Sequence, residues 1–241
     1  MKLPFGLLKE KRHPSHKYLR KLILRILWFE SLSKNLDFRI KINYIIADMN
    51  KLKKSEIGHL KRYKFAPACE NEQVVFGAAR PGYTNQMVED WIEFMKSQGI
   101  KRVCCLLPDE QLASYSDLLE TYKQQFGRQL VCWAPIADFN LADLETLTQQ
   151  IIPFLREADK QNQKVVVHCS GGIGRTGHVL AAWLVSVRGL SNEAAIKAVK
   201  KTGRNPYEAA IAAIFKGKNP FKVAKDIDIL LNNCRLLLRG D

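Results

Sequence analysis

The chain has 241 residues, of which 46% are hydrophobic, and a formal net charge of +14. This length is enough to bury a core without disulfides or a structural metal, and it suits one domain with an extension or two small domains. Because the longest apolar run falls far short of the roughly 18 residues of a membrane span, and the N-terminus lacks a secretory apolar stretch, we expect a soluble, cytoplasmic protein with reduced cysteines.

The positive charge is concentrated at the N-terminus. Residues 1–65 hold 17 Lys and Arg against 5 Asp and Glu, whereas the remaining 176 residues hold 21 against 19. This shift predicts a domain boundary near Pro67, with a basic, helical extension over residues 1–66 and the main domain over 67–241. Apolar side chains at 17–33 share one face of a predicted helix. Three interpretations stay open for this helix: binding to an anionic membrane surface, a nucleic-acid contact, or ordinary packing on the domain.

Further along the chain, short β-rich runs alternate with helical segments. This pattern is typical of an α/β fold in which helices flank a mainly parallel sheet of four to five strands. Asn85, Asp109 and Ser191 are expected N-caps, and Pro153 is expected to kink or break its helix. The predicted strands cover 74–76, 103–107, 130–133 and 164–168. The predicted helices cover 85–99, 109–127, 141–155, 175–188, 191–203 and 206–238, the last interrupted near 217–220.

A glycine-rich loop joins the apolar strand 164–168 to the helix that begins at Arg175. Its main-chain N–H groups and the positive end of the helix are expected to bind an anion such as phosphate. Cys169 opens the loop, and these donors together with Arg175 favour its thiolate form. The planar guanidinium of Arg175 can hold two phosphate oxygens, and the Thr176 hydroxyl can donate to the sulfur. The predicted phosphate-binding residues are Ser170, Gly171, Gly172, Ile173, Gly174 and Arg175.

The run His168-Cys169, five further residues and Arg175-Thr176-Gly177 resembles the signature of the cysteine-dependent protein tyrosine and dual-specificity phosphatases. The resemblance covers roughly residues 74–210. It implies a metal-independent phosphoric monoester hydrolase without a cofactor, in which Cys169 is the nucleophile and His168 supports the loop by hydrogen bonding. A buried structural thiol, a sulfur transferase and a catalytically inactive phosphate-binding module are competing interpretations of the same loop.

The family's mechanism also needs a general acid on a loop upstream of the cysteine. Residues 133–140 follow a predicted strand and are similar to the family's acid loop, which makes Asp138 the candidate. The match is imperfect, because Ala137 stands where the family usually has proline. Asp143 is the alternative, although the helix dipole already explains a carboxylate in the first turn of the predicted helix 141–155.

The loop also bears on the substrate. Its interior carries no Lys, Arg or His, and phosphoinositides would benefit from such cations. We therefore expect phosphoproteins, with phosphotyrosine alone or also phosphoserine and phosphothreonine according to the depth of the pocket. Phosphoinositides and RNA 5′-phosphates are the alternative substrates. His178 is expected to be structural, and residues 80–83 are interpreted as a simple turn rather than as part of the pocket rim.

Overall fold

A computed structural model describes residues 57–209 and 220–237. Contacts along the chain divide the protein into two units, Met1–Glu56 and Ile57–Asp241, and the described residues all belong to the second. The helix predicted at 17–33 lies outside them. None of the helices in the described ranges has both the length and the apolar composition that crossing a membrane requires.

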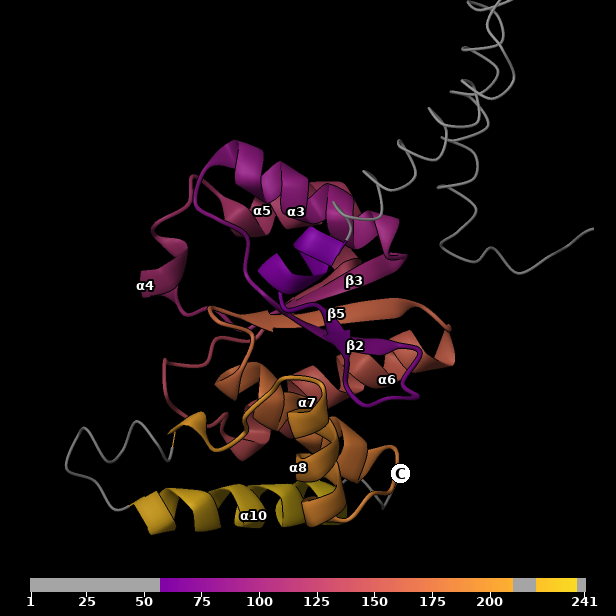
Figure 1. Cartoon of the computed structure of the whole chain (residues 1–241), viewed down its shortest axis with the longest axis vertical. Coiled ribbons are helices and arrows are strands. Elements are labelled where there is room, and N and C mark those ends of the chain that lie inside the picture. The colour runs from indigo at the N-terminus through magenta and orange to yellow at the C-terminus, as the bar shows by residue number, and fades with distance from the viewer. Residues whose placement is uncertain (1–56, 210–219, 238–241) are drawn as a thin grey trace, which may run out of the picture. The chain divides into compact units, whose positions relative to one another are not determined.

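A five-stranded sheet forms the centre of the domain, in the order β1-β2-β5-β3-β4 (Figure 1). The strands are β1 (Ala66–Pro67), β2 (Val75–Ala79), β3 (Ile100–Cys105), β4 (Val131–Trp133) and β5 (Lys164–Cys169). All neighbours are parallel except β1, which pairs antiparallel with β2. The predicted mainly parallel sheet is thus confirmed. The central position of β5 explains its continuous apolar sequence, because residues 165–167 are buried on both faces.

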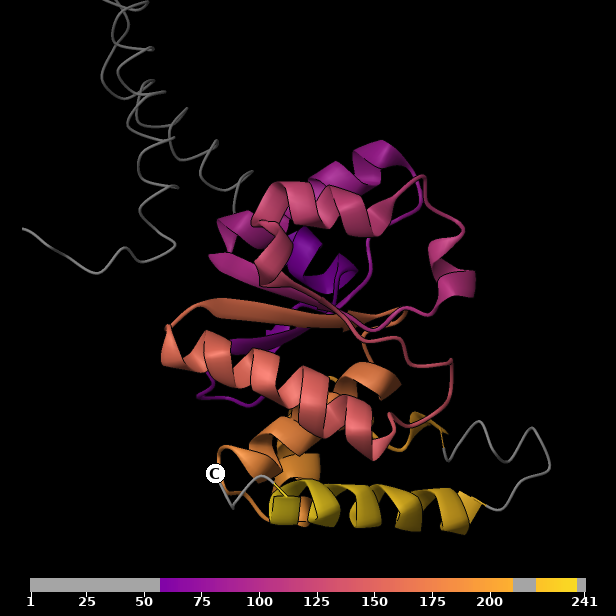
Figure 2. The ribbon, with the colours of Figure 1, turned by 180° about the vertical axis from the view of Figure 1, so that it is seen from behind.

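Helices cover both faces of the sheet (Figures 1 and 2). On one face, α3 (Asn85–Ser97) and α5 (Leu118–Phe126) pack around Trp91 and Tyr122. On the other face lie α6 (Ile152–Lys160), α7 (Gly174–Ser186), α8 (Asn192–Lys201) and α10 (Pro220–Leu237). α7 contacts the sheet, α8 and α10, and every residue from 174 to 185 is buried. The start of α7 is therefore held firmly in place.

Local capping explains where the helices on the first face differ from those predicted. Thr84, rather than Asn85, caps α3 by accepting a main-chain N–H at 3.3 Å. The single helix predicted over 109–127 is two helices, α4 (Asp109–Leu112) and α5. Asp117 causes the break, because its carboxylate accepts a main-chain N–H at 3.0 Å and starts a new helix.

The helix predicted over 141–155 covers residues 144–160 instead, and its hydrogen-bonding pattern changes along its length. A π-helical segment (Thr146–Ile151) precedes α6, and a 3₁₀ turn (Arg128–Leu130) precedes β4. Pro153 lies just after this π-helical segment, and residues 144–160 stay helical throughout, so the helix does not break at Pro153. Ser191 caps α8 as predicted, through a hydrogen bond of 3.2 Å from the N–H of Ala194.

Residues 57–67 pack with this domain, although the charge pattern assigned most of them to the extension. Residues 57–62 are helical, and Tyr63 is buried with its ring centroid 5.4 Å from that of Phe94 in α3. The chain then forms β1, in which Ala66 pairs with Gly77 of β2. Packing here depends on the apolar residues that lie between the charged ones. The boundary near Pro67 was predicted from charge alone, so it did not take these apolar residues into account.

A buried carboxylate joins the turn before β2 to the end of α7. Glu72 accepts hydrogen bonds from the N–H of Val74 (2.9 Å) and from Nε1 of Trp183 (3.1 Å), and it pairs with Nε of Arg188 (2.9 Å). Burial alone would raise the pKa of Glu72, but the bonds from Arg188, Val74 and Trp183 outweigh it and lower this pKa below its ordinary value. Arg188 also pairs with Asp159 of α6 at 2.7 Å, so the network joins three elements.

Substituting Glu72→Gln should lower the free energy of unfolding by about 2–4 kcal/mol at pH 7, because a neutral amide cannot replace the charge-assisted bonds to a partly buried arginine. Urea denaturation measures the loss. Glu70→Gln removes the same charge from an exposed position and should change stability by less than about 0.5 kcal/mol. Since the folded-state pKa of Glu72 is lowered, the difference between wild type and Glu72→Gln should shrink as the pH falls below the ordinary carboxyl range. Equal stability of the two variants would show that the network contributes nothing.

Candidate active site

The glycine-rich loop follows β5 at the edge of the sheet where parallel strands end. Ala79 of β2 is in register with Cys169, and Cys105 of β3 is in register with His168. Gly172 adopts a left-handed conformation (φ 66°), and a Cβ at this position would lie 2.5 Å from the main chain of Ala78. The tight loop therefore excludes any side chain at position 172.

The sulfur of Cys169 lies inside this loop, and the residue is only 2% exposed. The N–H of Gly172 and the hydroxyl of Thr176 both donate to Sγ at 3.2 Å. Because α7 begins at Gly174, the positive end of its dipole lies at the loop. These groups all stabilise negative charge on the sulfur. The predicted contact between Thr176 and the sulfur is present.

His168 lies directly before the loop, and its ring packs among aromatic side chains while hydrogen bonding with the main chain of Cys169. The buried ring lies edge-on to Trp91 and Tyr122, with centroids 5.3 and 5.6 Å away. Burial lowers the pKa of His168 to about 3, so the ring is neutral at pH 7. The aromatic neighbours come from α3 and α5, far away in the sequence, so the sequence did not predict this packing.

Arg175 connects the glycine-rich loop to the predicted acid loop. Its Nη2 lies 2.8 Å from Oδ1 of Asp138, and its Nη1 donates to the carbonyl oxygen of Ile136 at 3.0 Å. The Arg175 side chain is 3% exposed, whereas that of Asp138 is 45% exposed. The structure thus holds an accessible carboxylate against an enclosed guanidinium at the edge of the loop.

Asp143 bonds to its own helix. Its Oδ1 accepts the N–H of Thr146 and its Oδ2 accepts the Thr146 hydroxyl, both at 2.7 Å. These two hydrogen bonds lower the pKa of Asp143 below its ordinary value. Of the two candidate acids, Asp138 contacts Arg175. Asp143 lies at the start of its helix, as the helix-dipole interpretation of the sequence predicted.

Gln111 of α4 joins the same constellation, and the sequence analysis did not identify it. Its Oε1 accepts a hydrogen bond from Nη1 of Arg175 at 3.1 Å, and its Nε2 donates to Oδ2 of Asp138 at 3.4 Å. One signal in the sequence could have found it: Gln111 closely follows the predicted strand 103–107, at the sheet edge where functional side chains of parallel α/β folds gather.

Arg80 also reaches the loop, so the interpretation of residues 80–83 as a simple turn is wrong. Its main-chain N–H donates to the carbonyl of Cys169 at 3.0 Å, and its Nε donates to Oγ of Ser170 at 3.3 Å. The guanidinium lies 3.8 Å from the centroid of the Tyr83 ring and also bonds to the Tyr83 hydroxyl. It donates to the Tyr115 hydroxyl at 2.6 Å. Arg80 therefore attaches two tyrosines to the wall of the site.

Two further side chains hold the backbone around the site. Nε2 of His178 accepts the N–H of Ala142 at 3.0 Å, which fastens the chain beyond the acid loop to α7. Burial lowers the pKa of His178 to about 4, so the ring is a neutral acceptor at pH 7. Oε2 of Glu208 accepts the N–H of Gly174 at 2.8 Å. One predicted phosphate donor is thus already bonded to a carboxylate.

Comparisons with known proteins agree with this geometry. Residues 76–189 match the family model described as "Polymorphic toxin system, DSP-PTPase phosphatase". A dual specificity protein phosphatase, OPG106 of vaccinia virus (strain Western Reserve), is 33% identical over 52 residues, which are 22% of this chain and 30% of that protein. A putative tyrosine phosphatase, 123R of invertebrate iridescent virus 6, is 30% identical over 34% of this chain and 58% of its own length. The chain thus matches less than two thirds of the length of each viral relative.

Solved structures share the fold. A crystal structure of Tk-PTP in the active form has 25% sequence identity and a TM-score of 0.50, over 67% of this chain and 97% of that one. PTPMT1 in complex with PI(5)P has a TM-score of 0.54 over 73% of this chain and 99% of that one, at 15% identity. The parallel sheet and the cysteine loop at the start of α7 resemble those of the cysteine-dependent phosphatases. Within that class, the chain is similar to the dual-specificity and protein tyrosine phosphatases.

The two buried histidines predict how stability depends on pH. Their folded-state pKa values, about 3 for His168 and about 4 for His178, lie below the ordinary value near 6.5. Between pH 6.5 and 5 the unfolded chain therefore binds protons that the folded chain does not, and stability falls as the pH falls. The slope should approach about 1.4 kcal/mol per pH unit for each histidine.

Urea denaturation at several pH values in this window measures the slope. His178→Gln, whose amide oxygen can still accept the N–H of Ala142, should lose about half of it. An unchanged slope in this variant would contradict a neutral, buried His178.

Proposed function

We propose that this chain is a phosphoprotein phosphatase that works through a phosphocysteine intermediate on Cys169. One observation carries the chemistry: two donors lie 3.2 Å from the Cys169 sulfur at the positive end of α7. Donors in this arrangement stabilise a thiolate, which is the nucleophilic form of cysteine, and the surrounding amides attract the phosphate group that it attacks. The loop N–H groups and Arg175 supply the positive charge, so the proposed reaction uses neither a metal ion nor a cofactor.

In the first step the Cys169 thiolate attacks phosphorus in line with the departing oxygen. A P–S bond forms, the P–O bond to the leaving group breaks, and protonated Asp138 gives its proton to that oxygen. Arg175 and the loop amides bind the remaining phosphate oxygens, most tightly in the transition state. The arriving phosphate takes over from Asp138 as the anionic partner of the guanidinium, which leaves the carboxyl free to carry a proton.

The second step returns the enzyme to its starting state. Asp138, now ionised, takes a proton from water, and the water oxygen attacks phosphorus. The P–S bond breaks, and inorganic phosphate and the Cys169 thiolate are released. The Thr176 hydroxyl, 3.2 Å from Sγ, stabilises the sulfur as it leaves.

Aromatic side chains around the loop favour phosphotyrosine as the substrate group. Tyr83 is 51% exposed and is tied to Ser170 of the loop through Arg80. Phe139 is 43% exposed and follows Asp138 directly. Exposed rings on two sides of a phosphate loop offer stacking surfaces to an aryl phosphate, and aromatic pairs contribute about 0.5–1.5 kcal/mol beyond burial.

Other substrates of this chemistry are phosphoinositides and RNA 5′-phosphates. The PTPMT1 structure contains PI(5)P, but at 15% identity this neighbour establishes only a common fold. The residues of the loop between Cys169 and Arg175 offer no additional cation to a polyphosphorylated ring. Phosphoproteins therefore remain the proposed substrate, and an anionic membrane or nucleic acid that contacts residues 17–33 remains a proposed partner.

Substitution of the proposed acid should depend on the leaving group. Asp138→Ala should reduce kcat on a phosphotyrosyl peptide by about 10²–10⁴-fold, because the departing oxygen then lacks a proton donor. The loss should be much smaller with 2,4-dinitrophenyl phosphate, whose leaving group needs no proton. Asp143→Ala is the matched control and should leave both rates nearly unchanged. Equal losses on both substrates for Asp138→Ala would assign the proton to another group.

The substrate class is tested by comparing kcat/KM in excess EDTA on four substrates: a phosphotyrosyl peptide, a phosphoseryl peptide, a phosphatidylinositol phosphate in micelles and an RNA 5′-phosphate. We expect the phosphotyrosyl peptide to give the highest value. Cys169→Ser should turn over none of them while still binding the peptide, because the hydroxyl is a weak nucleophile that leaves the loop intact. A higher value on the lipid or the RNA would reassign the substrate, and no wild-type turnover at all would indicate an inactive phosphate-binding module.

A further inference from the structure

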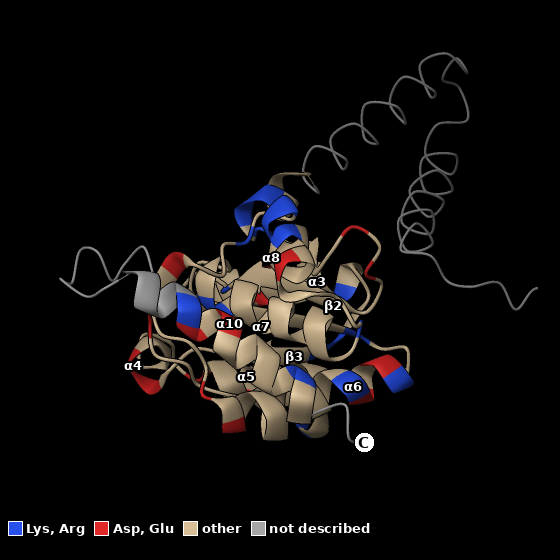
Figure 3. Ribbon diagram, turned by 90° about the horizontal axis from the view of Figure 1, so that it is seen from below, with Lys and Arg blue, Asp and Glu red and all other residues tan. Residues whose placement is uncertain are grey.

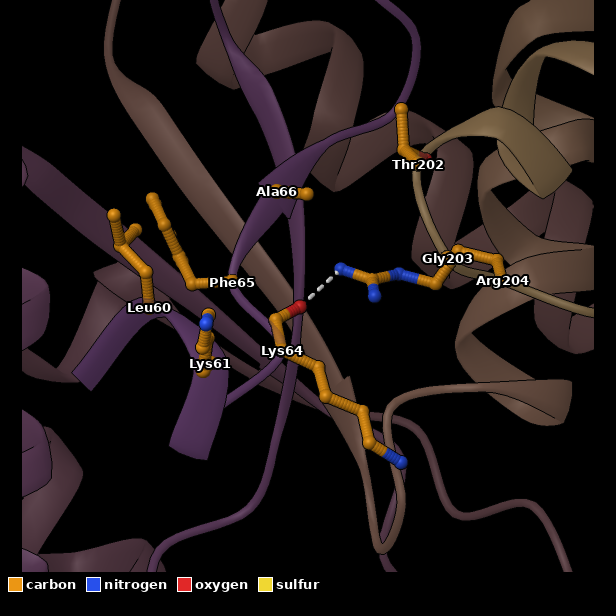
Figure 4. A pocket seen from close by; sticks show the side chains of 8 residues that line it. All are labelled: Leu60, Lys61, Lys64, Phe65, Ala66, Thr202, Gly203 and Arg204. Carbon is orange, nitrogen blue, oxygen red and sulfur yellow. Dashed lines mark hydrogen bonds between the residues drawn. The ribbon is translucent and has the colours of Figure 1, made fainter. Parts of the chain in front are cut away.

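A cavity at the β1 edge of the domain plays no part in the proposed catalysis (Figure 4). Residues 60–66 form one wall, and Thr202, Gly203 and Arg204, which follow α8, form the other. Its volume is about 340 Å³, within the range of ~300–1,000 Å³ that small-molecule sites occupy. Leu60 and Phe65 supply apolar lining, and the polar lining is mainly basic.

The most unusual group of this cavity is a buried arginine. Arg204 is 3% exposed, and Figure 4 shows its side chain extending from the α8 side toward the main chain of Lys64. Its Nη2 donates to the carbonyl oxygens of Lys64 and Gly77, both at 2.6 Å. Its Nε is buried without a partner, and no Asp or Glu of the described part pairs with it. Burial lowers the pKa of Arg204 to about 10.

A buried cation that no acidic residue pairs with is costly, because two carbonyl dipoles replace only part of the hydration that it loses. Negative charge on the Cys169 sulfur offsets part of this cost. Instead of an acidic residue, two exposed lysines line the cavity with Arg204, and two more lie close by in the sequence. Lys61 and Lys64 line the cavity, and Lys200 and Lys201 form the last turn of α8 just before Thr202. Figure 3 shows Lys and Arg gathered beside α8. Every charged side chain of the cavity is therefore positive.

We propose that this cavity is a second, non-catalytic phosphate-binding site, which takes the phosphate group of a small phosphorylated molecule or of a lipid headgroup. A phosphate dianion adds negative charge beside Arg204, which has no acidic partner among the described residues, and its oxygens accept hydrogen bonds from the ammonium groups of Lys61 and Lys64. Leu60 and Phe65 contact the less polar part of the ligand. A carboxylate carries one charge at most, so it compensates three cations less well.

Lys61 and Lys64 are the residues to change, because both are exposed and neither belongs to the proposed catalytic machinery. Arg204 is unsuitable for the first test, since its neighbour Asn205 donates to the carbonyl of Ile173 in the catalytic loop at 3.4 Å. Lys64 has φ 47°, a conformation that asparagine tolerates. The test variant is therefore Lys61→Gln/Lys64→Asn. Its control, Lys101→Gln/Lys160→Gln, removes the same charge from exposed positions on β3 and α6.

Calorimetric titration with inorganic phosphate should give two binding events in the wild type, one at the catalytic loop and one at this cavity. The double variant should weaken one event at least about tenfold, because it removes two charge-assisted bonds. Competitive inhibition of aryl phosphate turnover by phosphate should stay unchanged, which separates this site from catalysis. The control variant should retain both events.

A second arm distinguishes the sources of phosphate. The protein is sedimented with phosphatidylcholine vesicles that contain phosphatidylinositol 4-phosphate. If the wild type and the control bind these vesicles and the double variant does not, the site binds a lipid headgroup. Two phosphate events without vesicle binding assign it to a small soluble molecule. A single phosphate event in the wild type without vesicle binding overturns the proposal. So does a double variant that binds both probes as tightly as the control.

Discussion

The position of the acid loop depends on one guanidinium. Arg175 is enclosed at the start of α7, which the sheet, α8 and α10 hold in place. From there it bonds to Asp138, to the carbonyl of Ile136 and to Gln111. A loop that forms no strand or helix is thereby fixed by polar contacts to a rigid element. The guanidinium that is proposed to bind phosphate, that of Arg175, thus also holds the carboxylate of Asp138 in place.

Two other contacts complete this support, and they act on the chain on either side of the site. His178 holds the N–H of Ala142, and Arg80 holds Ser170 and two tyrosines. Each support is a hydrogen bond from a rigid helix or strand end to a loop. The packed helices and strands therefore fix the positions of the loop residues, as is usual for parallel α/β folds, in which functional side chains lie beyond the strand ends.

Features that depend on nearby residues could be predicted from the sequence. The parallel sheet follows from alternating runs, and the cysteine, its Thr176 donor and the glycine loop all lie within one short segment. Contacts between distant segments could not be predicted. The aromatic packing of His168, the bonds of Gln111 and the reach of Arg80 all join residues from different strands and helices. The packing of residues 57–66 with the domain could not be predicted for the same reason, because it depends on contacts such as that of Tyr63 with Phe94, which is far away in the sequence.

The strand order has a consequence for how the protein is made. β5 lies at the centre of the sheet, yet it is the last strand in the chain, so β2 and β3 have no common neighbour until it is synthesised. A nascent chain that ends before residue 164 exposes two unpaired strand edges, which are prone to aggregation. The cysteine is added directly as this central strand is completed. The last strand of the sheet and the cysteine at its end are therefore synthesised together, and the sheet cannot be complete before the cysteine is present.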